Sequence, residues 1–118
     1  MLLRSVFLPC AVLFFAASIY AGPVSGQTVG LGLAQANNCM SCHRVDRKVV
    51  GPGFSTIAQR FAGNPEAADY LAQSIVNGSR GRWGPVPMPR QAHVSPNDAR
   101  ALAQWILSLN DSPADKVE

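Results

Sequence analysis

Charged residues are scarce in this sequence, and their balance excludes one large class of partners. Ten lysine and arginine residues stand against seven acidic residues, which gives a net charge of +3. Nucleic-acid-binding domains carry a strongly basic stripe, so we expect no nucleic-acid partner. Apolar and polar residues nowhere alternate as they do in a half-buried β-strand, and no internal repeat is visible. Only short patterns typical of helices remain.

The one long hydrophobic run is at the N-terminus. Arg4 precedes an almost unbroken apolar stretch over residues 6–20, which is too short for a comfortable membrane span of ~20 residues. A positive charge, an apolar run and then small residues are typical of a secretory signal peptide. We therefore expect residues 1–26 to be a cleaved signal peptide. Residues 27–118 then form one small periplasmic domain with no stable membrane insertion; an uncleaved anchor is the alternative.

Cysteine is rare, and Cys10 falls inside the predicted signal peptide. The exported domain keeps only Cys39 and Cys42, which are too close together for a disulfide to stabilise the fold usefully. Cys39-Met40-Ser41-Cys42-His43 is instead the attachment pattern of a c-type haem. Two thiols one helical turn apart can form thioethers with one edge of the macrocycle, and His43 follows as the proximal iron ligand.

Three other interpretations of the cysteine pair remain open. A thioredoxin-like redox pair needs a βαβ setting, which the sequence does not indicate. Half of a zinc site would have to use the adjacent Cys42 and His43, which rarely share one tetrahedral ion. The third alternative is a plain short disulfide. We predict one covalently bound haem c, because it would also supply a large apolar plate around which a small domain can pack.

Candidate ligands for the other face of the iron are few. Met40 lies inside the attachment turn and cannot reach that face. Met88 stands between Pro87 and Pro89, so a stiff loop presents its thioether, which raises the potential relative to bis-histidine ligation. His93 would give that bis-histidine ligation. We predict Met88 as the ligand; its alternative role is a gap-filling core residue.

Other residues are candidates for the surroundings of the haem. The carbonyl of Pro52, or that of Gly51, can accept the free ring N–H of His43, which fixes the plane of the imidazole. Trp83 can pack on the haem edge and donate its indole N–H to a propionate. The basic residues are expected to be mostly solvated, with one of them offsetting a propionate and several steering partners. These are Arg44, Arg47, Lys48, Arg80 and Arg82.

Helical periodicity and capping residues predict four helices. Their expected positions are residues 28–38, 55–61, 67–76 and 99–109. The last is the strongest, and residues 95–98 precede it with serine at the N-cap, proline next and an acidic residue two positions later. Residues 79–94 show no periodicity and contain three closely spaced prolines, which indicates a long, stiff loop.

Taken together, the chain resembles the small bacterial class I cytochromes c of the c-551 or c8 type. The motifs that carry the resemblance are Cys39-Met40-Ser41-Cys42-His43, Val50-Gly51-Pro52, Phe61-Ala62-Gly63, Asn77-Gly78-Ser79, Trp83-Gly84-Pro85-Val86-Pro87-Met88-Pro89 and the helix around Trp105. The resemblance implies an all-α fold, with about four short helices around one covalent haem c. It implies His43 and Met88 as axial ligands. It also implies that the side-chain amide of Gln91 holds the methionine sulfur.

The resemblance further implies a function. A six-coordinate iron has no open position for a substrate, so we expect an electron carrier and not an enzyme. The expected partners are a quinol-oxidising complex or another donor, and a terminal oxidase or nitrite reductase as acceptor. We expect a monomer that docks transiently. Two other functions remain open: a haem-based sensor or peroxidase with a labile Met88, and a dedicated docking subunit of one enzyme.

Overall fold

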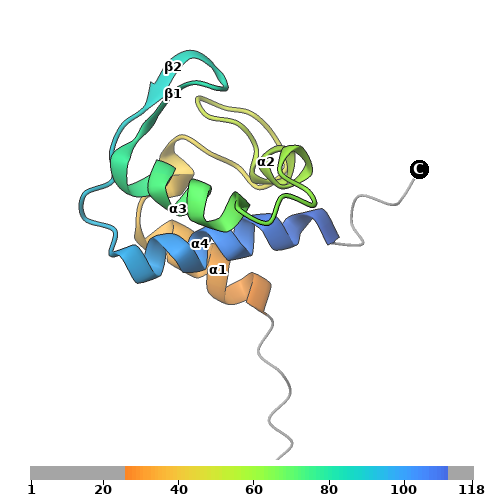
Figure 1. Cartoon of the computed structure of the whole chain (residues 1–118). Coiled ribbons are helices and arrows are strands. Elements are labelled where there is room, and N and C mark those ends of the chain that lie inside the picture. The colour runs from red at the N-terminus through yellow and green to blue at the C-terminus, as the bar shows by residue number, and fades with distance from the viewer. Residues whose placement is uncertain (1–25, 112–118) are drawn as a thin grey trace, which may run out of the picture.

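Four α-helices make up about half of residues 26–111, the part of the chain that this computed structural model describes (Figure 1). The elements are α1 (Gly26–Ala36), η1 (Cys39–Ser41), α2 (Phe54–Arg60), α3 (Ala67–Asn77), β1 (Ser79–Gly81), β2 (Gly84–Met88), α4 (Pro96–Ser108) and η2 (Leu109–Asp111). All four predicted helices are present, each close to its expected bounds. The predicted signal peptide, residues 1–26, lies outside the described residues except for Gly26 and stays a prediction. Within residues 26–111, no helix is both long enough and apolar enough to cross a membrane.

Helix α4 is the centre of the packing, since α1, α2 and α3 all lie against it (Figure 1). Its start has the predicted capping arrangement. The backbone N–H of Asp98 donates to the Ser95 hydroxyl at 3.1 Å, and that hydroxyl donates to the Asp98 carboxylate at 2.8 Å. Pro96 occupies the first turn, where its missing N–H costs nothing. The buried side of α4 consists of Ala99, Leu102, Ala103, Trp105 and Ile106.

Gly30 allows α1 to cross α4 closely. A Cβ atom at Gly30 would lie 2.0 Å from Cγ of Trp105, so the indole fills the space that any side chain there would need. Trp105 in turn meets the ring of Phe54 edge-on, with the centroids 5.4 Å apart. Phe54 is stacked on the imidazole of His43 at 5.0 Å. A continuous series of rings therefore connects the helix crossing to His43.

The hairpin of β1 and β2 is an element that the sequence analysis did not predict. Ser79 pairs with Met88 and Gly81 with Gly84, which leaves Arg82 and Trp83 as a two-residue turn. The usual hairpin signal places glycine or asparagine inside such a turn, whereas here Gly81 and Gly84 flank it with positive φ values. Both prolines of β2 lie between its paired residues Gly84 and Met88, where a register shift interrupts the ladder, so their missing N–H groups cost no ladder hydrogen bond. The prediction of an irregular loop over residues 79–94 was therefore wrong for its first half.

Candidate functional site

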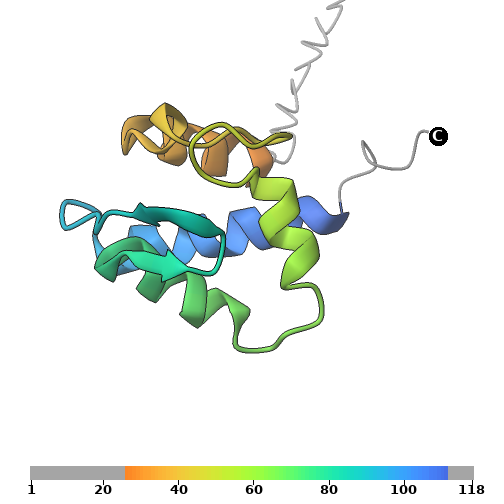
Figure 2. The same cartoon turned by 90° about the horizontal axis from the view of Figure 1, so that it is seen from above.

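A cavity of about 350 Å³ lies between two parts of the fold. The attachment turn and the loop that follows it form one wall, the hairpin and α3 form the other (Figure 2), and Leu102 and Ile106 of α4 lie at its base. This volume is in the range of sites for cofactors and small molecules, ~300–1,000 Å³. All of the predicted site residues line this cavity: Cys39, Cys42, His43, Pro52, Trp83, Met88 and Gln91.

The attachment turn is a tight 3-10 turn preceded by a residue in the left-handed region. Asn38 has φ 64° and ψ 15°, which ends α1 and redirects the chain into η1. The backbone N–H groups of Cys42 and His43 both donate to the Cys39 carbonyl, at 3.2 and 3.0 Å. Cys39 and Cys42 are half-buried free thiols on the cavity wall. The turn therefore presents both sulfurs and the imidazole to the same space.

The surroundings of Cys39 do not suit the alternative interpretations of the pair. Burial raises the pKa of the Cys39 thiol, and a hydrogen bond to its backbone only partly opposes this. Redox-active pairs instead have a cysteine whose pKa is lowered. In the described part of the chain, no three histidine, cysteine or acidic side chains come together as a metal site. The geometry therefore gives no support to a thioredoxin-like pair or a zinc centre.

His43 is buried, with 7% of its surface exposed, and its ring is fixed by a backbone carbonyl. Its Nδ1 lies 2.8 Å from the oxygen of Pro52, so Pro52 and not Gly51 is the carbonyl that meets the ring. Because a carbonyl can only accept, Nδ1 carries the proton and Nε2 keeps its lone pair for a metal. Gly51 touches the ring as well: a Cβ there would lie 2.4 Å from Cε1 of His43.

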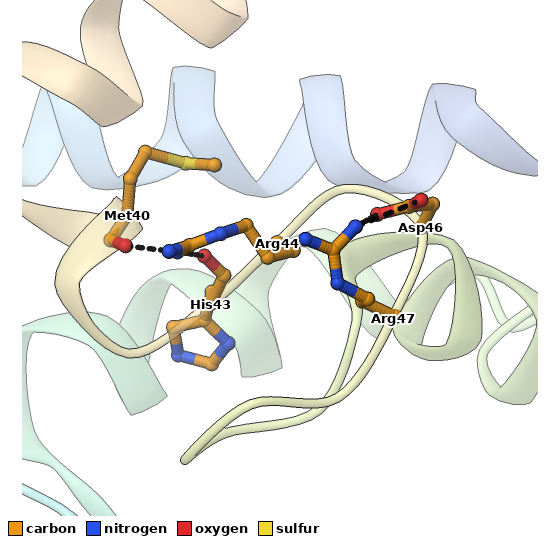
Figure 3. A network of polar contacts seen from close by, with 5 residues as sticks. All are labelled: Met40, His43, Arg44, Asp46 and Arg47. Atoms are coloured by element: carbon orange, nitrogen blue, oxygen red, sulfur yellow. Dashed lines mark hydrogen bonds and ion pairs between the residues drawn. The ribbon is translucent and has the colours of Figure 1, made fainter.

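Arg44 braces the attachment turn, which the sequence analysis did not foresee (Figure 3). Its guanidinium donates to the carbonyls of Met40 and His43, the latter at 2.7 Å. The side chain is half-buried, so the expectation that it is solvated was wrong. The neighbouring Arg47 does lie in solvent, where it pairs with Asp46 at 3.2 Å. Spacing alone relates Arg44 to Met40, four positions earlier, and that spacing is too common to be a signal.

Met88 ends β2 on the opposite wall and is half-buried. Its carbonyl lies against Gly78, where a Cβ would approach that oxygen to 2.8 Å, and the φ of 81° at Gly78 also favours glycine. The side-chain amide of Gln91 donates to the Pro89 carbonyl at 2.8 Å and so braces the loop just after Met88. A role of that amide toward the sulfur of Met88 stays a prediction. His93 also lines the cavity, but its side chain is exposed.

Trp83 lies in the hairpin turn and is half-buried, and two arginines hold this turn against the helices. The guanidinium of Arg60 lies over the indole, 4.4 Å from the centroid, and donates to the Arg82 carbonyl at 2.8 Å. Arg82 lies over the ring of Tyr70 at 4.6 Å and donates from Nε to its hydroxyl at 2.7 Å. Arg82 is exposed, as expected, although its guanidinium makes these contacts, and the contacts of Arg60 were not predicted. Sequence carries no signal for these contacts, because they join residues 22 and 12 positions apart.

These features fit a covalently held haem. The cavity is lined mainly by apolar side chains; two thiols and an imidazole with a free Nε2 lie on one wall, and a thioether lies on the other. Nitrogen and thioether ligands are those that hold haem iron in cytochromes c. Trp83 lines the cavity and is half-buried, so its indole N–H can meet a polar substituent there.

Comparison with known proteins supports the same conclusion. The family model described as cytochrome c matches residues 29–110. Cytochrome c-552 of Nitrosomonas europaea is 53% identical over 77 residues, which cover 65% of this chain and 75% of that protein. Cytochrome c-551 of Pseudomonas denitrificans is 43% identical over 82 residues, which cover 70% of this chain and 99% of that protein.

Solved structures agree with these relatives. The crystal structure of wild-type Nitrosomonas europaea cytochrome c552 superposes with a TM-score of 0.67 at 51% identity, covering 68% of this chain and 99% of that one. The class I cytochrome MtoD of Sideroxydans lithotrophicus has a TM-score of 0.57 at 27% identity, over 70% of this chain and 94% of that one. The expected class I fold is therefore confirmed, and Cys39 and Cys42 fit the haem attachment motif of these proteins. This chain belongs to the cytochrome c family, as a small class I cytochrome with one covalently attached haem c.

Proposed function

We propose that this protein is a soluble periplasmic electron carrier in which His43 and Met88 are the two axial ligands of the haem iron. The observation that carries the proposal is the position of these two side chains on the two walls of one apolar cavity. The haem supplies the Fe(II)/Fe(III) couple. With both axial positions filled by the chain, no position is left for a substrate, and one-electron transfer at the haem edge is the remaining chemistry.

The surrounding residues suit that task. The Pro52 carbonyl holds the His43 ring in one plane and increases its basicity as a ligand. Phe54 stacks on the same ring, so the imidazole has little room to turn when the iron changes its oxidation state. The apolar lining keeps water away, and the indole of Trp83 is the proposed donor to a propionate. A rigid, dry site keeps the reorganisation that accompanies electron transfer small.

The proposed location and partners of the protein rest on the predicted signal peptide and on the family. We place the mature domain, residues 27–118, in the periplasm because residues 1–26 have the pattern of a secretory signal. The proposed donor is a quinol-oxidising respiratory complex, and the proposed acceptor is a terminal oxidase or a nitrite reductase. Encounters between such partners are weak and short-lived, which suits a monomeric carrier.

The first test is to express the full chain, leader included, in a bacterium that attaches haem covalently in its periplasm. Cell fractionation and intact mass give the location, the processed N-terminus and the covalent haem. Absorption spectra of the oxidised and reduced protein then report the ligands. We expect a sharp reduced α-band, the weak red charge-transfer band of methionine-ligated ferric haem, and no rapid binding of CO to the reduced protein.

Two other results would overturn parts of the proposal. Spectra without the charge-transfer band, together with rapid CO binding, would show an open or labile sixth position and favour a sensor or peroxidase. A holoprotein retained in the cytoplasmic membrane with its leader uncleaved would contradict the soluble carrier while leaving the axial ligands unaffected.

Replacing Gly51 by alanine should displace the proximal histidine. The new Cβ would lie 2.4 Å from Cε1 and 2.8 Å from Nδ1 of His43, so the ring must move away from the Pro52 carbonyl. We expect the free energy of unfolding of the holoprotein to fall by ~1–3 kcal/mol. The reduction potential should rise, because an imidazole without its carbonyl acceptor is a less basic ligand. Denaturant titration and redox titration measure the two effects.

The matched control is Val49→Ala on the same loop. The Val49 side chain is 46% exposed and does not line the cavity, so neither quantity should change appreciably. A Gly51→Ala protein that keeps the wild-type potential would mean that the hydrogen bond between His43 and Pro52 does not tune the iron.

A further inference from the structure

The hairpin that carries Met88 has little support of its own. It is a single two-stranded unit, which is marginally stable in water, and it packs chiefly on itself while the helices pack on one another. The hairpin and the attachment turn lie apart (Figure 2), and both line the cavity. The position of Met88 therefore depends on the few contacts that join the hairpin to the helices.

Those contacts lie on both sides of Met88 along the chain. After Met88, the backbone N–H of Gln91 donates to the Ile75 carbonyl of α3 at 3.0 Å. Before it, the turn of the hairpin is joined to α2 and α3 by the two arginines described above. Met88 thus lies between two attachments. Met88 can withdraw from the cavity only if at least one of these two attachments breaks.

The arginine attachment consists of the contacts of Arg60 and Arg82, which join the hairpin turn to α2 and to α3. Arg60 of α2 contacts both residues of the hairpin turn. Its guanidinium donates to the Arg82 carbonyl at 2.8 Å and lies 4.4 Å from the centroid of the Trp83 ring. Arg82 of the turn reaches in the opposite direction to α3, over the Tyr70 ring at 4.6 Å and to its hydroxyl at 2.7 Å. Tyr70 is itself stacked on the buried Phe61 at 5.4 Å.

No carboxylate in the described part of the chain forms an ion pair with either arginine. The ion pairs there are Arg47 with Asp46 and Arg100 with Asp69. The placement of the two guanidinium groups therefore depends on the rings and oxygens that they contact. Guanidinium groups stack on aromatic faces and donate in fixed directions, which lysine cannot reproduce. The arrangement is specific to arginine and bridges three elements.

We propose that Arg60 and Arg82 are positioning residues that act through the hairpin to keep Met88 on the iron. The inference rests on the proposed ligation by Met88. Loss of the arginine attachment frees one end of the hairpin, so that the methionine leaves the iron more often and an external ligand enters faster. Arg60 and Arg82 thereby set how tightly the sixth position is closed and keep the protein a pure electron carrier.

The experiment uses the ferric holoprotein and imidazole as the entering ligand, at concentrations where opening limits the rate. The variants are Arg60→Met and Arg82→Met, and the matched control is Arg90→Met, which removes the same charge from an exposed position just after β2 that does not line the cavity. We expect imidazole to displace the methionine about fivefold faster in each of the two variants, as loss of an exposed cation–π contact predicts. Arg90→Met should match the wild type.

Further variants separate contact from charge and folding. Arg60→Lys keeps the charge but not the planar stack and should also exchange faster. Tyr70→Phe removes only the hydroxyl acceptor and should show a smaller increase in an intact fold. Denaturant titration of each variant measures its free energy of unfolding. The decrease must be too small for global unfolding to account for the faster ligand exchange.

Three outcomes would overturn the inference. Equal acceleration in Arg90→Met would assign the effect to charge alone. Exchange at the wild-type rate in Arg60→Met and Arg82→Met would show that the hairpin needs no such attachment. A wild-type protein without the methionine charge-transfer band would refute the axial assignment itself, and the positioning role with it, so the two failures are distinguishable.

Discussion

Replacing Met88 by alanine is expected to abolish the methionine charge-transfer band and to open the iron to CO. Alanine has no atom that can ligate iron, and Met88 is the only methionine that lines the cavity in the described part of the chain. The reduction potential should fall on the order of 0.1 V, a fraction of the ~0.8 V range that axial ligands set. Thioether sulfur favours the ferrous state relative to nitrogen or water. Spectra and redox titration of the holoprotein measure both effects.

The matched control for this variant is His93→Ala. His93 also lines the cavity, but it is exposed and its Nε2 lies 3.4 Å from the Asn37 carbonyl. If Met88 is the ligand, His93→Ala keeps the band and the potential of the wild type. If instead His93→Ala loses the wild-type spectrum while Met88→Ala retains it, the protein has bis-histidine ligation and the assignment of Met88 is wrong.

The attachment side of the site was predictable because its geometry is local. Five consecutive residues determine the turn, and the hydrogen bonds from Cys42 and His43 to the Cys39 carbonyl follow from that short spacing. The carbonyl of Pro52 was also anticipated, as one of two candidates. The start of α4 was predictable for the same reason, since Ser95 and Asp98 satisfy each other within one turn.

The other side of the site was less predictable because its geometry depends on contacts between distant segments. Nothing near Arg60 in the sequence indicates that it stacks on Trp83. The prolines of β2 argue against a strand in the sequence, but the ladder of this strand does not need their N–H groups. The sequence predicts a solvated charge at Arg44, because the acceptors that the side chain finds are main-chain carbonyls, which every sequence offers. Residue type and spacing predict the candidate ligands and the Pro52 carbonyl, whereas the arginine contacts around the site emerge only from the fold.

The crossing of α1 and α4 is the place where a single methyl group should have the largest effect on stability. In Gly30→Ala the new Cβ would lie 2.0, 2.3 and 2.5 Å from three atoms of the Trp105 indole, which is 6% exposed. Such an overlap with a buried ring cannot be relieved by turning a flexible side-chain end. We expect the free energy of unfolding of the holoprotein to fall by about 2–3 kcal/mol. Denaturant titration followed by circular dichroism measures it.

Gly32→Ala is a matched control, because it places the same methyl group in the same helix with nothing within 4 Å. Both variants gain the helix propensity of alanine over glycine, ~0.5–1 kcal/mol, so Gly32→Ala should be more stable than the wild type. The difference between the two variants then isolates the helix crossing, and equal stabilities would mean that α1 does not pack on Trp105 as described. The effect should also reach the iron: Trp105 meets Phe54, and Phe54 stacks on His43. A shifted potential in Gly30→Ala, but not in Gly32→Ala, would show that the helix crossing positions the proximal ligand.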